Sequence, residues 1–136
     1  METSCGIVLV NIDSVLLLQY PQGHWGFPKG HIETIDSDLA TTALRELAEE
    51  TGIRDVSLYP NWQSRTEYSF QKKGKETSKQ VHWFLGDTRI FTVKLSHEHL
   101  NHLWLTWEEA GEQLTFESEK EVLKSAKKEH SKGRMR

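Results

Sequence analysis

Apolar residues form two short uninterrupted runs near the start of the chain, at residues 6–10 and 15–18. The polar residues between the runs indicate a hairpin, because β-rich runs separated by a few polar residues are typical of paired strands. Helical spacing of apolar positions predicts helices over 107–113 and 117–130. Strands that come before and between helices indicate an α/β layered fold. Further strands are expected at 56–59, 65–70, 80–85 and 103–106, with a hairpin tip at 72–76.

A further helix is expected before Gly52, and it carries three carboxylates in one narrow stripe. Glu46, Glu49 and Glu50 have i, i+3 and i+4 spacing. Like charges at these spacings destabilise a helix, and a hard cation such as Mg²⁺ would remove the repulsion because it prefers carboxylate oxygens. The alternative is a solvated acidic face. The opposite, core-facing side holds Ala40, Ala43, Leu44, Leu47 and Ala48, and the expected N-cap is Ser37 or Asp38.

The segment 25–31, Trp-Gly-Phe-Pro-Lys-Gly-His, lies one loop before this acidic helix. Its glycines let the backbone approach a phosphate closely, and Lys29 supplies a point charge for that phosphate. A phosphate-binding loop beside a carboxylate stripe indicates metal-assisted phosphoryl chemistry.

Residues 45–53 read Arg-Glu-Leu-Ala-Glu-Glu-Thr-Gly-Ile and resemble the second half of the Nudix hydrolase signature at every fixed position. The resemblance implies the Nudix fold, an α/β/α sandwich with a mixed β-sheet, formed here as a single domain over residues 1–136. It also implies that the substrate is a nucleoside diphosphate linked to some other group, which the signature does not identify.

The first half of the signature is matched less well. The sixth residue after Gly30 is Asp36, where the family has Glu, and Arg45 comes one residue late. Glu33 and Asp36 therefore both remain candidates for the first acidic position. We expect the extra residue in the loop between Glu33 and Ser37, because an insertion inside the helix would rotate everything beyond it by about 100°.

The resemblance also implies a metal site. Glu46, Glu49 and Glu50, together with the carbonyl oxygen of Gly30, would hold Mg²⁺, with Mn²⁺ able to take its place. Such an ion would lower the pKa of the water that attacks phosphorus.

Further charged residues receive roles from the same resemblance. Arg45 would orient the glutamates through a bidentate contact, and Lys29 would stabilise the leaving phosphate. The general base stays open between Glu49 and Glu98.

Within the family, segments 79–84, 95–100 and 107–110 resemble the asymmetrical diadenosine tetraphosphate hydrolases, as does 25–31. This implies Mg²⁺-dependent cleavage of a dinucleoside polyphosphate to ATP and AMP. RNA 5′-end pyrophosphohydrolases share several of these features, so they and nucleoside triphosphate pyrophosphatases remain alternatives. An alternative of a different class is a catalytically silent Nudix-like module that senses nucleotides.

Two aromatic residues are candidates for holding a base. Trp83 and Phe116 would stack on adenine, because aromatic rings bind bases of any sequence by stacking. The alternative for both is ordinary core packing. Lys29, His31 and Lys79 are the candidates for contacts with the phosphate chain.

The composition excludes several classes of partner. A net charge of −3 gives no general attraction to nucleic acid or anionic membranes. One cysteine, Cys5, cannot form an internal disulfide, and no signal peptide or membrane-length apolar run is visible. We therefore expect a cytoplasmic monomer or weak dimer without membrane partners, for which RNA 5′ ends are the one nucleic-acid possibility. The basic residues near the end are expected to complement a helix dipole, and the alternative is a patch that binds RNA or steers polyphosphate. They are Lys124, Lys127, Lys128, Lys132, Arg134 and Arg136.

Overall fold

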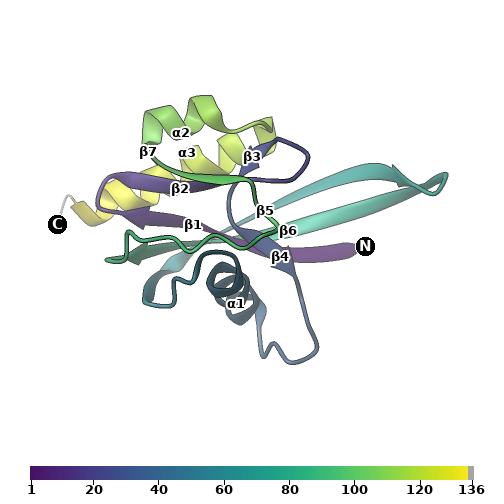
Figure 1. Cartoon of the computed structure of the whole chain (residues 1–136), viewed down its shortest axis with the longest axis horizontal. Coiled ribbons are helices and arrows are strands. Elements are labelled where there is room, and N and C mark those ends of the chain that lie inside the picture. The colour runs from purple at the N-terminus through teal and green to yellow at the C-terminus, as the bar shows by residue number, and fades with distance from the viewer. Residues whose placement is uncertain (135–136) are drawn as a thin grey trace.

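The computed structural model describes residues 1–134, so Arg136 lies outside the described residues. The strands are β1 (Glu2–Asn11), β2 (Ser14–Gln19), β3 (Trp25–Gly26), β4 (Lys29–His31), β5 (Val56–Lys72), β6 (Lys75–Thr88) and β7 (Asn101–Thr106). The helices are α1 (Leu39–Thr51), α2 (Trp107–Gln113) and α3 (Glu117–Arg134). A mixed sheet lies between α1 on one face and α2 and α3 on the other (Figure 1). This confirms the expected α/β/α sandwich.

β1 and β2 separate beside segment 25–31, the candidate phosphate loop. β1 runs parallel to β6, and it pairs with β2 next to their shared turn, at Val10↔Val15 and Asn11↔Ser14. Farther from the turn, β4 takes the place beside β1, and β3 takes the place beside β2. Segment 25–31, expected as a loop, is therefore two short strands, and the pairing Cys5↔Gly30 fixes its backbone against the sheet.

The two early apolar runs are uninterrupted because both faces of the sheet are covered. Ile7 and Leu9 of β1 pack with Leu47 of α1. The alternate residues Val8 and Val10 belong to the cluster that also holds the buried residues of α2 and α3. A strand that is buried on both faces does not alternate between apolar and polar residues.

Helix α1 begins and ends where its caps predict. The Asp38 side chain accepts a hydrogen bond from the Thr41 N–H, and Gly52 adopts a left-handed φ of 77° at the C-terminal end. The helix is regular from Leu39 to Thr51. The extra residue of the signature therefore lies before the helix, as expected.

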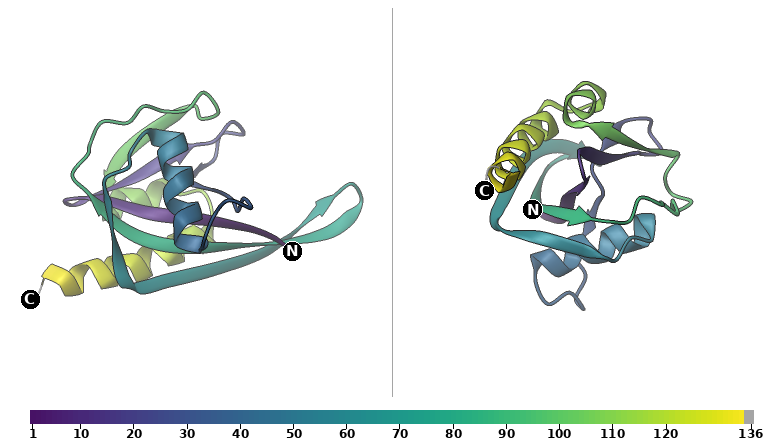
Figure 2. Two further views of the ribbon diagram at one scale, coloured as in Figure 1. Left: turned by 90° about the horizontal axis from the view of Figure 1, so that it is seen from below. Right: turned by 90° about the vertical axis from the view of Figure 1, so that its left-hand side faces the viewer.

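The two strands expected at 56–59 and 65–70 are parts of the single long strand β5. An irregularity in its pairing with β6 lies between Leu58 and Gln63, and it explains why the sequence pattern is interrupted there. The outer part of the β5–β6 hairpin projects from the body of the molecule (Figures 1 and 2). Within residues 1–134, no helix combines the length and the apolar character needed to cross a bilayer.

Candidate active site

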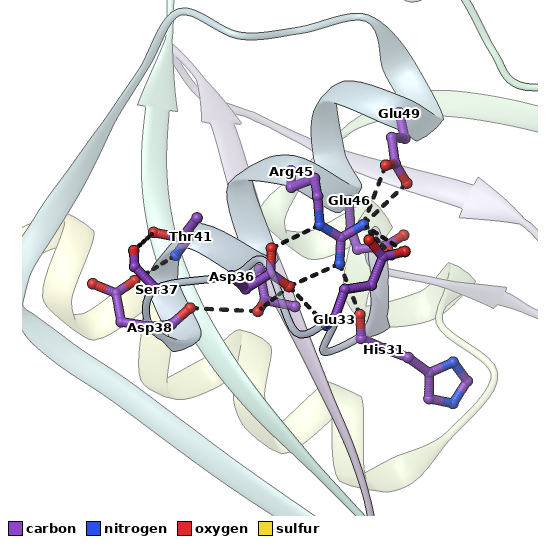
Figure 3. A network of polar contacts seen from close by, with 10 residues as sticks. His31, Glu33, Asp36, Ser37, Asp38, Thr41, Arg45, Glu46 and Glu49 are labelled. Carbon is purple, nitrogen blue, oxygen red and sulfur yellow. Dashed lines mark hydrogen bonds and ion pairs between the residues drawn. The ribbon is translucent and has the colours of Figure 1, made fainter.

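Arg45 of α1 is the centre of a polar network that joins the helix to the loop before it (Figure 3). Its Nε and Nη2 atoms donate to the two carboxylate oxygens of Asp36, at 2.9 and 3.0 Å. The Asp36 side chain is only 2% exposed and also accepts hydrogen bonds from the Thr42 hydroxyl and the Glu33 N–H. These donors, Arg45 first, hold the pKa of Asp36 well below its usual range. Asp36 is therefore the buried acidic partner of Arg45. The Glu33 side chain is exposed, and its Oε1 lies 3.7 Å from Nη1 of Arg45.

The same guanidinium also contacts two of the helix glutamates. Nη1 of Arg45 donates to Oε1 of Glu46 at 2.9 Å and to both oxygens of Glu49 at 3.2 Å, and Nη2 donates to the His31 carbonyl at 2.8 Å. The bidentate contact expected with the glutamates is made instead with Asp36. Arg45 thus ties the loop before α1, the end of β4 and the glutamates together.

The glutamate stripe is only partly solvated, in contrast to the fully solvated acidic face that was the alternative. Glu50 is buried, and burial together with the charge of Glu46 raises its pKa to about 9. Glu46 is half-buried, and burial raises its pKa too. Glu49 is the most exposed of the three, at 55% of its side chain.

Gly30 allows β4 to lie directly against α1. A Cβ atom at this position would overlap the Glu46 carboxylate, so a larger residue would displace that side chain. The β4 backbone and the glutamates consequently share one cavity of about 660 Å³. This cavity, called the acidic cavity below, is lined by residues that include Lys29, Gly30, His31, Glu46, Glu49, Glu50, Lys79, Glu98 and His99.

Two lysines face each other at the acidic cavity. Burial and the neighbouring Lys29 ammonium lower the pKa of Lys79 to about 8. Burial, followed by the charge of Lys79, lowers the pKa of His31. A phosphate group placed between these side chains would relieve their mutual repulsion.

Next to the acidic cavity lies a second cavity of about 470 Å³, called the aromatic pocket below. Lys29 borders both cavities. Phe116 is 46% exposed, and its ring centroid lies 5.2 Å from that of His24. The other residues that line the aromatic pocket are Gln22, Thr66, Tyr68, Val81, Trp83, Ser118 and Glu119.

The role expected for Trp83 needs correction. Trp83 exposes 1% of its surface, donates its indole N–H to the Thr66 hydroxyl at 3.0 Å and packs edge-to-face on Phe27. Neither face of the ring is open to a base, so the prediction that Trp83 is a stacking surface was wrong. Trp83 instead forms the floor of the aromatic pocket, because the sheet, Phe27 and Thr66 enclose it.

The profile of the NUDIX domain matches residues 2–126. The chain belongs to the Nudix family. It is 38% identical over 112 residues to the asymmetrical bis(5′-nucleosyl)-tetraphosphatase of Rattus norvegicus, covering 79% of this chain and 74% of that protein. It is 28% identical over 112 residues to an RNA pyrophosphohydrolase of Pelagibacter ubique, covering 71% and 70%. The solved binary complex of a C. elegans Ap4A hydrolase superposes with a TM-score of 0.76 and 28% identity, covering 91% of this chain and 93% of that one.

Nudix enzymes generally use divalent metal ions, and the residues of this Nudix hydrolase fit such an ion. Within residues 1–134, no three His, Cys, Asp or Glu side chains converge around one point, and Arg45 donates hydrogen bonds to Glu46 and Glu49. Oε1 of the buried Glu50, however, makes no hydrogen bond to any described residue. A buried carboxylate oxygen without a partner beside a second carboxylate suits a hard cation.

Several residues of this Nudix site were missed from the sequence. His99 is buried, its Nε2 lies 3.4 Å from Oε2 of Glu50, and its Nδ1 lies 3.0 Å from the Ser96 hydroxyl. Tyr68 is 44% exposed at the aromatic pocket, and Glu119 is buried there. Glu119 accepts a hydrogen bond from the Phe27 N–H, and burial raises its pKa. The alternation of β5 would have identified Tyr68, but no local pattern distinguishes His99 or Glu119.

Proposed function

We propose that this Nudix hydrolase is an asymmetrical diadenosine tetraphosphate hydrolase that uses Mg²⁺ and releases ATP and AMP. The observation that carries the proposal is that Lys29 borders both the aromatic pocket and the acidic cavity. A nucleoside held in the aromatic pocket would have its phosphates led past Lys29 to the glutamates. The similarity to the rat tetraphosphatase supports the same choice.

The aromatic pocket suits an adenine base. The exposed rings of Phe116 and Tyr68 offer stacking surfaces, and His24 extends the surface beside Phe116. The buried carboxylate of Glu119 can accept a hydrogen bond from an amino group on the base. The pocket thus combines a mainly apolar wall with a few polar groups, as nucleotide sites do.

The phosphate chain would lie in the acidic cavity. Lys29, Lys79 and His31 surround the position next to the glutamates, and their crowded positive charges favour an anion. One end of the substrate is held in the aromatic pocket, so the reacting phosphorus is set by its distance from that end. This geometry favours unequal products.

Residues of α1 and of the loop after β6 would perform the chemistry. Glu46, Glu49 and Glu50 would hold the metal ion, which when bound polarises phosphate oxygens and lowers the pKa of water. Arg45 keeps the Glu46 and Glu49 side chains on the cavity side of the helix. A carboxylate at Glu49 or Glu98, both at the cavity wall, would accept the proton of the attacking water.

The test is incubation with diadenosine tetraphosphate and Mg²⁺, with products separated by chromatography. Equal amounts of ATP and AMP are expected, with slower turnover of free ATP and none after chelation of divalent ions. Two molecules of ADP, no cleavage, or full activity in the chelator would overturn the proposal. The Glu98→Gln and Glu49→Gln variants, compared over a range of pH, identify the base, because the variant without its base loses the acid limb of the rate profile.

RNA 5′ ends are the second candidate, favoured by the similarity to the Pelagibacter ubique enzyme. Their terminal base would enter the aromatic pocket, and the rest of the RNA would leave past Lys79. RNA with a 5′-triphosphate belongs in the same assay, and preferential removal of pyrophosphate from it would select this reading. Tight nucleotide binding without turnover of any substrate would select a nucleotide-sensing module instead.

A further inference from the structure

The outer part of the β5–β6 hairpin, residues 67–80, forms a two-stranded arm that projects from the body of the molecule (Figures 1 and 2). β6 pairs with β1 from Lys79 onwards, so beyond the pair Tyr68↔Lys79 the two arm strands pair only with each other in the described chain. An arm of this kind buries little apolar surface on its own and is marginally stable in isolation. Core formation therefore does not explain why the arm carries exposed aromatic and cationic residues.

The two faces of the arm differ in chemistry. The register pairs Tyr68↔Lys79, Phe70↔Thr77 and Lys72↔Lys75. Directly opposed residues in an antiparallel pair share a face, as do residues two apart on one strand. One face thus carries aromatic and cationic side chains. The other face carries acidic and neutral polar ones: Glu67, Ser69, Gln71, Glu76, Ser78 and Gln80.

The aromatic and cationic face is the one that continues the active site. Tyr68 lines the aromatic pocket, and the opposed Lys79 lines the acidic cavity. Farther out, the ring of Phe70 lies 6.1 Å from that of Tyr68 and is partly exposed. Nζ of Lys72 lies 3.7 Å from Glu2, whose other oxygen lies 3.7 Å from His31 of the candidate phosphate loop. Glu2 thus connects the arm to the acidic cavity.

We propose that this face binds the second nucleoside of a dinucleoside polyphosphate, with its base stacked on Phe70 and its adjoining phosphates against Lys72 and Lys75. The proposal rests on the proposed function, since the aromatic pocket encloses one base and the substrate has two. Aromatic rings with lysines beside them suit a base followed by phosphates. The arm positions from Lys79 to Lys75 extend over about 13 Å, which is the scale of several phosphates and a ribose.

A site of this kind would give the enzyme selectivity for two-ended substrates. Contacts with the remote nucleoside contribute binding energy that a mononucleotide cannot supply. The alternative is that Tyr68 and Phe70 only stabilise the arm as neighbouring side chains on one face. The two readings differ in which substrates respond to a change at Phe70.

The experiment compares diadenosine tetraphosphate with adenosine 5′-tetraphosphate, which has the same phosphate chain and one base. The Phe70→Ala and Lys72→Ala variants should each lower kcat/KM for the two-base substrate by about tenfold. In the Phe70→Ala variant, kcat/KM for the one-base substrate should change less than about twofold. Gln71→Ala on the opposite face is the matched control, and it should alter neither substrate. Circular dichroism melting curves check that each variant folds like the unmodified protein.

Three results would overturn the proposal. The first is an unchanged kcat/KM for diadenosine tetraphosphate in the Phe70→Ala variant, and the second is an equal loss of kcat/KM for both substrates. The third is a loss of kcat/KM confined to 5′-triphosphorylated RNA of several nucleotides. Calorimetric titration with a methylene-bridged, non-hydrolysable diadenosine tetraphosphate separates the arm from the chemistry. Absence of cleavage refutes the proposed function, whereas analogue binding that weakens in Phe70→Ala would still support the arm. Absence of analogue binding by the unmodified protein would overturn both.

Discussion

Replacing Trp83 with Ala tests whether this ring is the floor of the aromatic pocket or a surface on which a base stacks. The side chain is 1% exposed and contacts Phe27 edge-to-face, with ring centroids 5.4 Å apart. Truncating a buried Trp to Ala costs about 3–5 kcal/mol of the free energy of unfolding, because a cavity is left behind. Domains are stable by only about 5–15 kcal/mol, so Trp83→Ala should be close to unfolding at physiological temperature.

Trp83→Phe is the variant that keeps the measurement possible. It preserves most of the ring and removes the hydrogen bond from the indole N–H to Thr66, which spans 3.0 Å. The expected loss is about 1 kcal/mol for the hydrogen bond, with a further contribution from the smaller ring. The measurement is guanidinium unfolding followed by far-ultraviolet circular dichroism, alongside KM for diadenosine tetraphosphate.

Phe116→Ala is the matched control, because Phe116 lines the same pocket and is 46% exposed. Its free energy of unfolding should change little, whereas substrate binding should weaken by about 1–3 kcal/mol if stacking is lost. In Trp83→Phe the free energy of unfolding should fall, whereas KM for diadenosine tetraphosphate should change little. Unchanged stability in Trp83→Phe, combined with a rise in KM as large as that of Phe116→Ala, would refute the reasoning.

Three further changes have defined outcomes. Gly30→Ala should abolish turnover while the chain stays folded, because its Cβ would displace the Glu46 carboxylate; activity close to normal would contradict this close packing. Glu119→Gln should remove a pH dependence of stability. Burial raises the pKa of Glu119, so its contribution is complete below the usual glutamate pKa and is lost as pH rises through the folded value. Unfolding measured at about pH 5 and about pH 8 should therefore show a smaller decline in the variant, and an equal decline would exclude Glu119 as its source. Glu49→Gln should lower turnover by orders of magnitude with little effect on unfolding, because its side chain is 55% exposed; near-normal turnover would remove Glu49 from the metal set.

The sequence by itself determined the features that depend on near neighbours. Helix α1 begins after Asp38 and ends before Gly52, because capping and left-handed termination involve contacts within a few residues. The spacing of Glu46, Glu49 and Glu50 places them on one side of the helix for the same reason. The two early apolar runs predicted the strands β1 and β2, and the structure shows that β1 is covered on both faces.

The acidic partner of Arg45 could not be chosen from the sequence. Glu33 and Asp36 are both close along the chain, and the choice of Asp36 follows from the path of the loop before α1. That path buries the Asp36 carboxylate beside the guanidinium and leaves Glu33 exposed. A burial difference of this kind depends on where the loop meets the body of the protein.

Only the tertiary structure decided which aromatic rings face the substrate. Trp83 and Phe116 are both candidate stacking residues from the sequence, but Trp83 is enclosed by Thr66 and Phe27, and Phe116 is open. Local spacing specifies the side of a strand or helix on which a residue lies. The exposure of that side is set by segments distant in the chain, because burial results from the packing of whole elements.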